Sequence, residues 1–264
     1  MIIHSYFTEG YYPWALLFVE SLKKSNGEKH KVILSSRNLP EGKQNHLKSL
    51  YKNLEVRNKN LDYKEMAKKA GISLSTLMGF KSETEHIKIS KHNWVWKLMI
   101  SAEDRIREIR DVVSEQLDDE LVLNLDIDSY IRKKLDPWIE VIAENDFSSI
   151  IKYDKQIRKF GYIKKKAYVI ICCIQGYKVS NLSREFLDRW VFYIDRVSPK
   201  YRPRGFGQIT CYEAYMELKE KLWWGIIPPD TYSLTGNGDC ILWGANKGAK
   251  DANLIRFRKD FRAR

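Results

Sequence analysis

Short apolar runs alternate with amphipathic stretches along the first third of the chain. Runs of four to eight apolar residues predict buried strands, whereas apolar positions spaced three and four apart predict helices. The pattern indicates strands at residues 2–6, 31–35 and 54–56, and helices at 13–24 and 41–51. Strands that alternate with helices in this way are typical of a doubly wound α/β fold.

The remaining chain continues the pattern with one interruption. Residues 62–90 are polar and helical in composition, with turn signals at Gly71 and Gly79, and we interpret them as an insertion. Further on, the pattern predicts strands at 121–125 and 167–173, helices at 93–116, 183–194 and 208–222, and a loop-rich tail from residue 223 onward.

Two acidic residues, Asp126 and Asp128, directly follow the apolar run 121–125. Ligands of open α/β sheets collect just outside the carboxyl ends of such strands. The two carboxylates can face the same way only if the chain turns after Asp126, because side chains alternate in extended backbone. A hard cation, Mg²⁺ or Mn²⁺, would suit this pair. The alternative is two acids in a surface turn.

The composition limits the classes of partner. The 46 Lys and Arg against 34 Asp and Glu give a net charge of +12, which favours phosphorylated substrates, nucleic acid or an acidic membrane surface. No run of 18 apolar residues occurs, and the start of the sequence lacks a basic leader with a long apolar stretch, so we expect a cytoplasmic protein. The four cysteines, Cys172, Cys173, Cys211 and Cys240, lack metal-ligand spacing and indicate buried thiols.

Several stretches, taken in order, resemble the GT-A glycosyltransferases that use nucleotide-diphospho-sugars, of the glycogenin-like and lipopolysaccharide sugar transferase kind. The opening residues 5–24 resemble the first strand, nucleotide loop and following helix of that family. Residues 93–98 resemble the stretch ahead of its metal motif, and 121–130 its Asp-x-Asp strand. The last two matches are 174–180 with the acceptor-side strand and 205–210 with a helix start.

This resemblance implies one GT-A (Rossmann-like) domain over residues 1–264, with a mixed central sheet flanked by helices and a helical insertion around 62–90. Residues 1–130 would form the nucleotide-sugar-binding half and 131–264 the acceptor-binding half. The implied activity is a hexosyl transfer from a nucleotide diphosphate donor, with a UDP-sugar favoured, to a glycan, glycolipid or protein acceptor. The implied cofactor is Mn²⁺ or Mg²⁺.

The resemblance also implies particular site residues. Metal ligands would be Asp126, Asp128 and Asn246. Donor binding would use Ser5, Tyr6, Thr8, Tyr12, Lys97, Asp126 and Lys247, and catalysis Gln208 and Asp128. The alternatives are core packing for the tyrosines and solvated surface positions for the two lysines.

The sequence also departs from the family. Residues 242–248 lack the histidine that commonly completes the metal shell, so either Asn246 or water would take its place. Position 207 is glycine where the family often has aspartate, and a neutral amide such as that of Gln208 cannot act as a general base. Retention of anomeric configuration is therefore favoured over inversion, with Glu213 as the rival base.

Two other classes of function compete. Residues 64–78 resemble a helix-turn-helix and would suit DNA binding. Paired aspartates also serve metal-dependent phosphoesterases, although the five histidines form no spaced cluster. The basic, aromatic tail at 256–264 is either a frayed terminus or a peripheral contact with anionic lipid.

Overall fold

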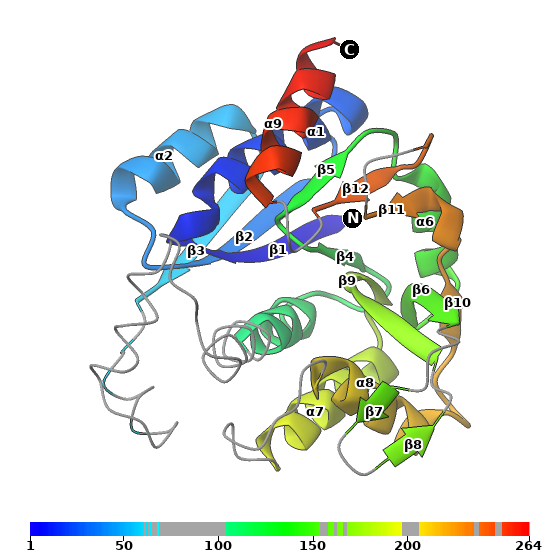
Figure 1. Ribbon diagram of the computed structural model, residues 1–264. Coiled ribbons are helices and arrows are strands. Elements are labelled where there is room, and N and C mark those ends of the chain that lie inside the picture. Colours follow the sequence, from blue (N-terminus) through cyan, green and yellow to red (C-terminus); the bar gives the residue numbers. More distant parts are fainter. Residues whose placement is uncertain are drawn as a thin grey trace.

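A mixed sheet with helices on both faces organises the computed structural model (Figure 1). The structure describes residues 1–60, 62, 64, 68, 104–153, 158–160, 163–165, 168–196, 206–234, 238–245 and 250–263. The predicted insertion at 62–90 and the first part of the helix predicted at 93–116 lie almost entirely outside these residues.

Seven strands of the described part form the main sheet, in the order β10-β6-β9-β4-β1-β2-β3. Their bounds are β1 Ile2–Thr8, β2 Lys31–Arg37, β3 Leu54–Lys59, β4 Leu121–Leu125, β6 Phe147–Tyr153, β9 Tyr168–Lys178 and β10 Trp224–Ile226. Strands β3, β2, β1 and β4 run parallel, whereas β9 is antiparallel to both β4 and β6. The sheet is thus mixed, as predicted.

The helices fall on the two sides of this sheet (Figure 1). Those on one side are α1 (Tyr12–Asn26), α2 (Glu41–Leu50) and α6 (Asp136–Ala143). A helical segment at 104–114 covers the other side with α7 (Asn181–Asp195) and α8 (Phe206–Leu218). The alternating helices and strands predicted for the first third of the chain are confirmed.

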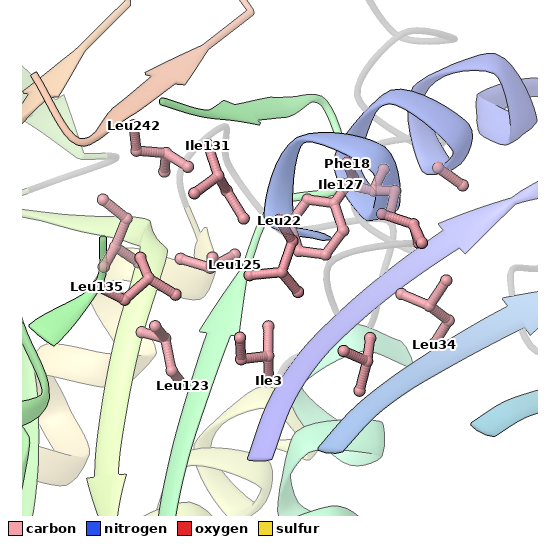
Figure 2. Close-up of a cluster of buried hydrophobic side chains, with 14 of the residues drawn as sticks. Ile3, Phe18, Leu22, Leu34, Leu123, Leu125, Ile127, Ile131, Leu135 and Leu242 are labelled. Atoms are coloured by element: carbon pink, nitrogen blue, oxygen red, sulfur yellow. The ribbon is translucent and has the colours of Figure 1, made fainter. Parts of the chain in front are cut away.

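Alternate residues of the central strands feed two separate cores, because successive side chains point to opposite faces. Ile3, Leu123 and Leu125 pack with α1 in the first core (Figure 2), whereas Ile2 and Val122 pack toward the helical segment at 104–114 and α7. Both faces are buried, which explains why these strands read as continuous apolar runs rather than alternating ones.

A small second sheet in the order β11-β12-β5 lies beside the first core (Figure 1). It joins β5 (Ser129–Ile131) to β12 (Leu242–Gly244) in antiparallel register and adds β11 (Tyr232–Ser233). The described part also contains a hairpin, β7 (Arg158–Phe160) with β8 (Ile163–Lys165), and two 3₁₀ turns, Glu9–Tyr11 and Pro229–Thr231.

The expectation of a loop-rich tail is wrong, and so is the frayed terminus. Residues after 223 contribute β10, β11 and β12, and the end forms a helix, α9 (Lys250–Ala263). Phe257 on α9 is completely buried, stacked on Tyr130 and edge-on to Trp14. The aromatic residues of the tail therefore anchor it to α1 and β5, which the alternating charges concealed.

Two further expectations concern cysteines and membranes. Cys211 and Cys240 are buried thiols, as predicted, but Cys173 is only partly buried. Within the described ranges, no helix combines the length and the apolar character needed to cross a bilayer.

Candidate active site

A tight turn carries Asp126 and Asp128 at the carboxyl end of β4. Strand β4 ends at Leu125, residues 127–128 form the turn, and β5 begins at Ser129. The backbone N–H of Asp126 donates to the Cys173 carbonyl at 3.0 Å, and that of Ala245 donates to the Asp128 carbonyl at 2.9 Å. Ile127 is buried in the first core between the two acids. The predicted turn is confirmed, and both acids are half-buried.

A guanidinium that the sequence interpretation missed sits on this turn. Arg105, from the helical segment at 104–114, forms an ion pair with the Asp126 carboxylate. The two side chains are 18% and 32% exposed, so the pair is shielded from much of the solvent. Nothing in the local pattern singles out Arg105 among the cations of this helix, since the contact joins residues 21 apart.

A network of charges fixes the helical segment that carries Arg105. Asp104 accepts hydrogen bonds from the Tyr6 hydroxyl and from Arg37 Nε, both at 3.1 Å. Glu108 accepts from Arg37 Nη2 at 2.5 Å and from Lys59 Nζ at 2.6 Å. Although burial opposes its ionisation, these cations hold the pKa of Glu108 below its usual value. The ends of β1, β2 and β3 thus position Arg105.

A buried phenol lies on the other side of the aspartate turn. Tyr232, the first residue of β11, is 6% exposed, and its hydroxyl is hydrogen-bonded to the Cys173 thiol. Burial raises the pKa of Tyr232 far above its usual value, and Cys173 and the carboxylates of Asp126 and Asp128 raise it further. The phenol therefore remains neutral. A Cβ atom at Gly244 would meet the Tyr232 oxygen at 2.5 Å, so the close approach of β12 requires glycine.

A row of buried polar side chains runs beneath the turn. His4 Nδ1 lies 2.8 Å from Asn124 Oδ1, which can only accept, so Nδ1 donates and Nε2 accepts from the Ser35 hydroxyl at 3.0 Å. Asn124 Nδ2 donates to Gln175 Oε1 at 3.1 Å. Burial lowers the pKa of His4 to about 4, so the ring stays neutral at physiological pH. Asn124 precedes Asp126 by two residues and shares its face of the sheet.

The predicted donor-binding residues in and after β1 differ in how deeply they are buried. The Ser5 side chain is completely buried and donates to the Leu125 carbonyl at 2.6 Å, which joins β1 to the end of β4. Tyr6 is 7% exposed, which matches the core-packing alternative. Thr8 and Tyr12 are half-buried, and the Tyr12 hydroxyl lies 2.6 Å from His46 Nδ1. Thr8 and Asp126 share one edge because β1 and β4 are parallel neighbours.

The other predicted site residues are on α8 or outside the described part of the chain. Gln208 is half-buried in the first turn of α8, and that turn is fixed by Trp190, whose Nε1 donates to the Gly207 carbonyl at 3.0 Å. Glu213, the rival base, is exposed. Lys97, Asn246 and Lys247 lie outside the described residues, although Ala245, immediately before Asn246, contacts Asp128.

The carboxylate pair has the chemistry that a hard cation requires. Two half-buried carboxylates of one turn offer oxygen ligands, and Mg²⁺ commonly takes only one or two carboxylates and keeps its other positions for water and phosphate. Over the described ranges, no three His, Cys, Asp or Glu side chains group together as a metal site. A cation here would therefore rely on Asp126 and Asp128 together with water, substrate or residues beyond those ranges.

Comparison with known proteins resolves the fold. No protein-family model and no curated protein matches the sequence. The structure of the galactosyltransferase LgtC with donor and acceptor sugar analogues matches with a TM-score of 0.63 at 10% identity, covering 100% of this chain and 96% of LgtC. The chain has the GT-A glycosyltransferase fold.

Two further solved structures agree with this GT-A fold. An active-site mutant of LgtC, in which glutamate replaces a glutamine, matches with a TM-score of 0.61 at 11% identity, covering 98% and 94% of the two chains. Mouse xyloside xylosyltransferase 1 matches with a TM-score of 0.51 at 10% identity, covering 94% of this chain and 99% of the mouse protein. At these identities the likeness concerns the fold, and the activity has to be argued from the site.

Proposed function

We propose that this protein is a metal-dependent glycosyltransferase that moves a sugar from a nucleoside diphosphate, with UDP favoured, to a glycan, glycolipid or protein acceptor. The observation that carries the proposal is the Asp126–Asp128 turn at the carboxyl end of β4, in a GT-A fold and beside the Arg105 guanidinium. A divalent cation held there would neutralise the charge that develops on the departing diphosphate.

Several residues of the chain would bind the cation and the diphosphate. Asp126 and Asp128 would hold the cation, and Asn246 would join them because it directly follows Ala245, which is bonded to Asp128. Arg105 can exchange its partner Asp126 for a phosphate oxygen, since a guanidinium binds carboxylate and phosphate with the same geometry. Lys97 and Lys247 would add positive charge to the diphosphate.

The nucleoside would bind at the edge where β1 ends. Thr8 and Tyr12 are the half-buried residues there, so they would contact the base and ribose, with Ser5 and Tyr6 supporting them from within. In this arrangement residues 1–130 supply most of the donor site, and residues 131–264 supply the acceptor side.

Gln208 would lie at the reacting sugar on the acceptor side. Its neutral amide cannot take a proton from the acceptor, which favours retention of configuration. An active-site mutant of LgtC, a protein of similar fold, replaces a glutamine, which supports a glutamine as the site residue here. Glu213 is exposed on α8 and remains the rival base.

The competing classes find less support. The fold is shared along nearly its whole length with glycosyltransferases, and residues 64–78 are only a short segment of the sequence.

A ligand screen tests the proposal directly. Thermal unfolding is recorded with uridine, guanosine and cytidine diphosphates and their sugars, with and without Mn²⁺, because a ligand of the native state raises its melting temperature. We expect uridine compounds to stabilise the protein only when Mn²⁺ is present. Stabilisation by guanosine or cytidine sugars alone would refute the donor assignment, and no response to any nucleotide sugar would refute the proposed function.

A further inference from the structure

Helix α9 is bound to the protein by one face and leaves the opposite face to solvent (Figure 1). Phe257 on the inner face is completely buried, and Asp260 accepts a hydrogen bond from the Tyr130 hydroxyl at 2.9 Å and pairs with Arg132 at 3.5 Å. One of the two acids of α9 is thus neutralised toward the protein, which leaves Asp251, in the first turn, as the acid of the outer face.

The outer face combines an apolar side chain with cations. Ile255 is 71% exposed, which is unusual for so large an apolar residue. At 100° per residue, Arg258, Lys259 and Arg262 lie within about 60° of Ile255 around the helix. All three are exposed, and Arg256 flanks them with its guanidinium 5.8 Å from the Trp243 ring. We call Ile255, Arg256, Arg258, Lys259 and Arg262 the outer α9 face.

A small cavity adds two more cations at the C-terminal end of α9. It has a volume of about 230 Å³, and Lys24, Arg132, Ser21, Ser25, Tyr130, Ile131 and Phe261 line it. Lys24 Nζ donates to the Phe261 carbonyl at 2.8 Å, and the Arg132 side chain is 10% exposed over the Trp243 ring. The Ser21 and Ser25 hydroxyls donate to backbone carbonyls of α1, so Lys24 and Arg132 are the cations of the cavity that would meet a phosphate.

We propose that the outer α9 face docks on an anionic phospholipid surface. Ile255 would enter the boundary between headgroups and acyl chains, while Arg258, Lys259 and Arg262 contact the lipid phosphates and the cavity takes a headgroup. An interfacial helix has this combination of an apolar side chain and basic neighbours. A nucleic-acid backbone would match the charge but would leave Ile255 without an apolar partner, so a bilayer fits the face better.

This docking is a property separate from the proposed glycosyl transfer. Binding to vesicles can be measured without any transferase assay. Sedimentation with vesicles of phosphatidylcholine containing 30% phosphatidylglycerol, against phosphatidylcholine alone, reports binding directly. Each cation near an anionic surface contributes about a fivefold factor, so R258Q/K259Q/R262Q should lower partitioning about 100-fold. Ile255→Ser should lower it about tenfold, because the apolar contact is lost while the charge is unchanged.

A control variant with the same change in net charge distinguishes binding through the outer α9 face from binding through overall charge. Lys48, Lys219 and Lys221 are exposed on α2 and near the end of α8, so K48Q/K219Q/K221Q removes the same charge from other surfaces. We expect this variant to bind anionic vesicles much more tightly than R258Q/K259Q/R262Q does. Equal losses in the two triple variants, no loss in Ile255→Ser, or no binding of the wild type would each overturn the proposal. Tighter binding to a DNA or RNA duplex, lost in R258Q/K259Q/R262Q, would also overturn it.

Discussion

The buried His4 ring makes the stability of this protein depend on pH in a way that one substitution should remove. The ring is completely buried and neutral, with Nδ1 bonded to Asn124 and Nε2 to Ser35. Its pKa is lowered from 6.5 to about 4 by burial. Since the unfolded chain takes up this proton near pH 6.5 and the folded chain only near pH 4, the unfolded state binds more protons between these values.

Stability from this group is therefore fully present above pH 6.5 and falls as the pH is lowered toward 4. One pKa unit corresponds to about 1.4 kcal/mol, so His4 accounts for a loss of about 3 kcal/mol once the pH is below 4. Between pH 7.5 and pH 5.0, His4 should account for a loss of about 2 kcal/mol in the free energy of unfolding. His30, whose pKa burial also lowers to about 4, and the paired carboxylates add losses of their own.

Urea unfolding of the wild type and of His4→Gln at pH 7.5 and pH 5.0 measures the part of the stability loss that is due to His4. The amide keeps polar partners for Asn124 and Ser35 but cannot titrate, so the loss between pH 7.5 and 5.0 should be about 2 kcal/mol smaller in the variant. His46→Gln, at an exposed position on α2, is the matched control and should behave as the wild type. An equal loss in His4→Gln and the wild type would refute the assignment of a neutral buried ring.

Three further predictions concern the site. Arg105→Gln should raise the KM for the donor about 10- to 100-fold, because it removes a charge-assisted bond of about 1.5–3 kcal/mol; Arg107→Gln, on the same helical segment but paired with Asp195, should leave steady-state kinetics unchanged. Gly244→Ala should cost about 1–3 kcal/mol in urea unfolding by displacing Tyr232 and should weaken Mn²⁺ binding, whereas Gly42→Ala, with nothing within 4 Å of its new Cβ, should not destabilise. Proton NMR of the fresh product should show the anomeric configuration of the donor, and the opposite configuration would replace Gln208 by Glu213 as the residue of interest.

Local patterns predict the parts of this fold that are built from neighbouring residues. The alternation from β1 to β3 and the turn after Asp126 follow from where apolar runs begin and end. The sequence could not predict contacts that depend on tertiary pairing. Residues 130 and 243 pair across the small sheet, 113 positions apart in the chain, and no local signal marks that pairing.

The same limit applies to the site. Asp126 and Asp128 are evident from a strand end, but the partners that surround them are brought there by other elements. Arg105 arrives on a helix fixed by Arg37, and Tyr232 arrives on a strand of the second sheet. The α9 helix had a usable signal in the spacing of Leu254, Phe257 and Phe261, three and four apart, which the intervening cations obscured.

If a cation at Asp126 and Asp128 drives sugar transfer, release of UDP from UDP-sugars must depend on Mn²⁺. The wild type should release UDP with Mn²⁺ and lose activity in EDTA. Asp128→Asn should keep its melting temperature, because a half-buried carboxylate at the rim contributes little to the core, and should lose metal-dependent release. Asp188→Asn, at an exposed position on α7, is the control and should retain activity. Wild-type turnover by a folded Asp128→Asn variant in Mn²⁺ would show that Asp128 does not hold a catalytic cation.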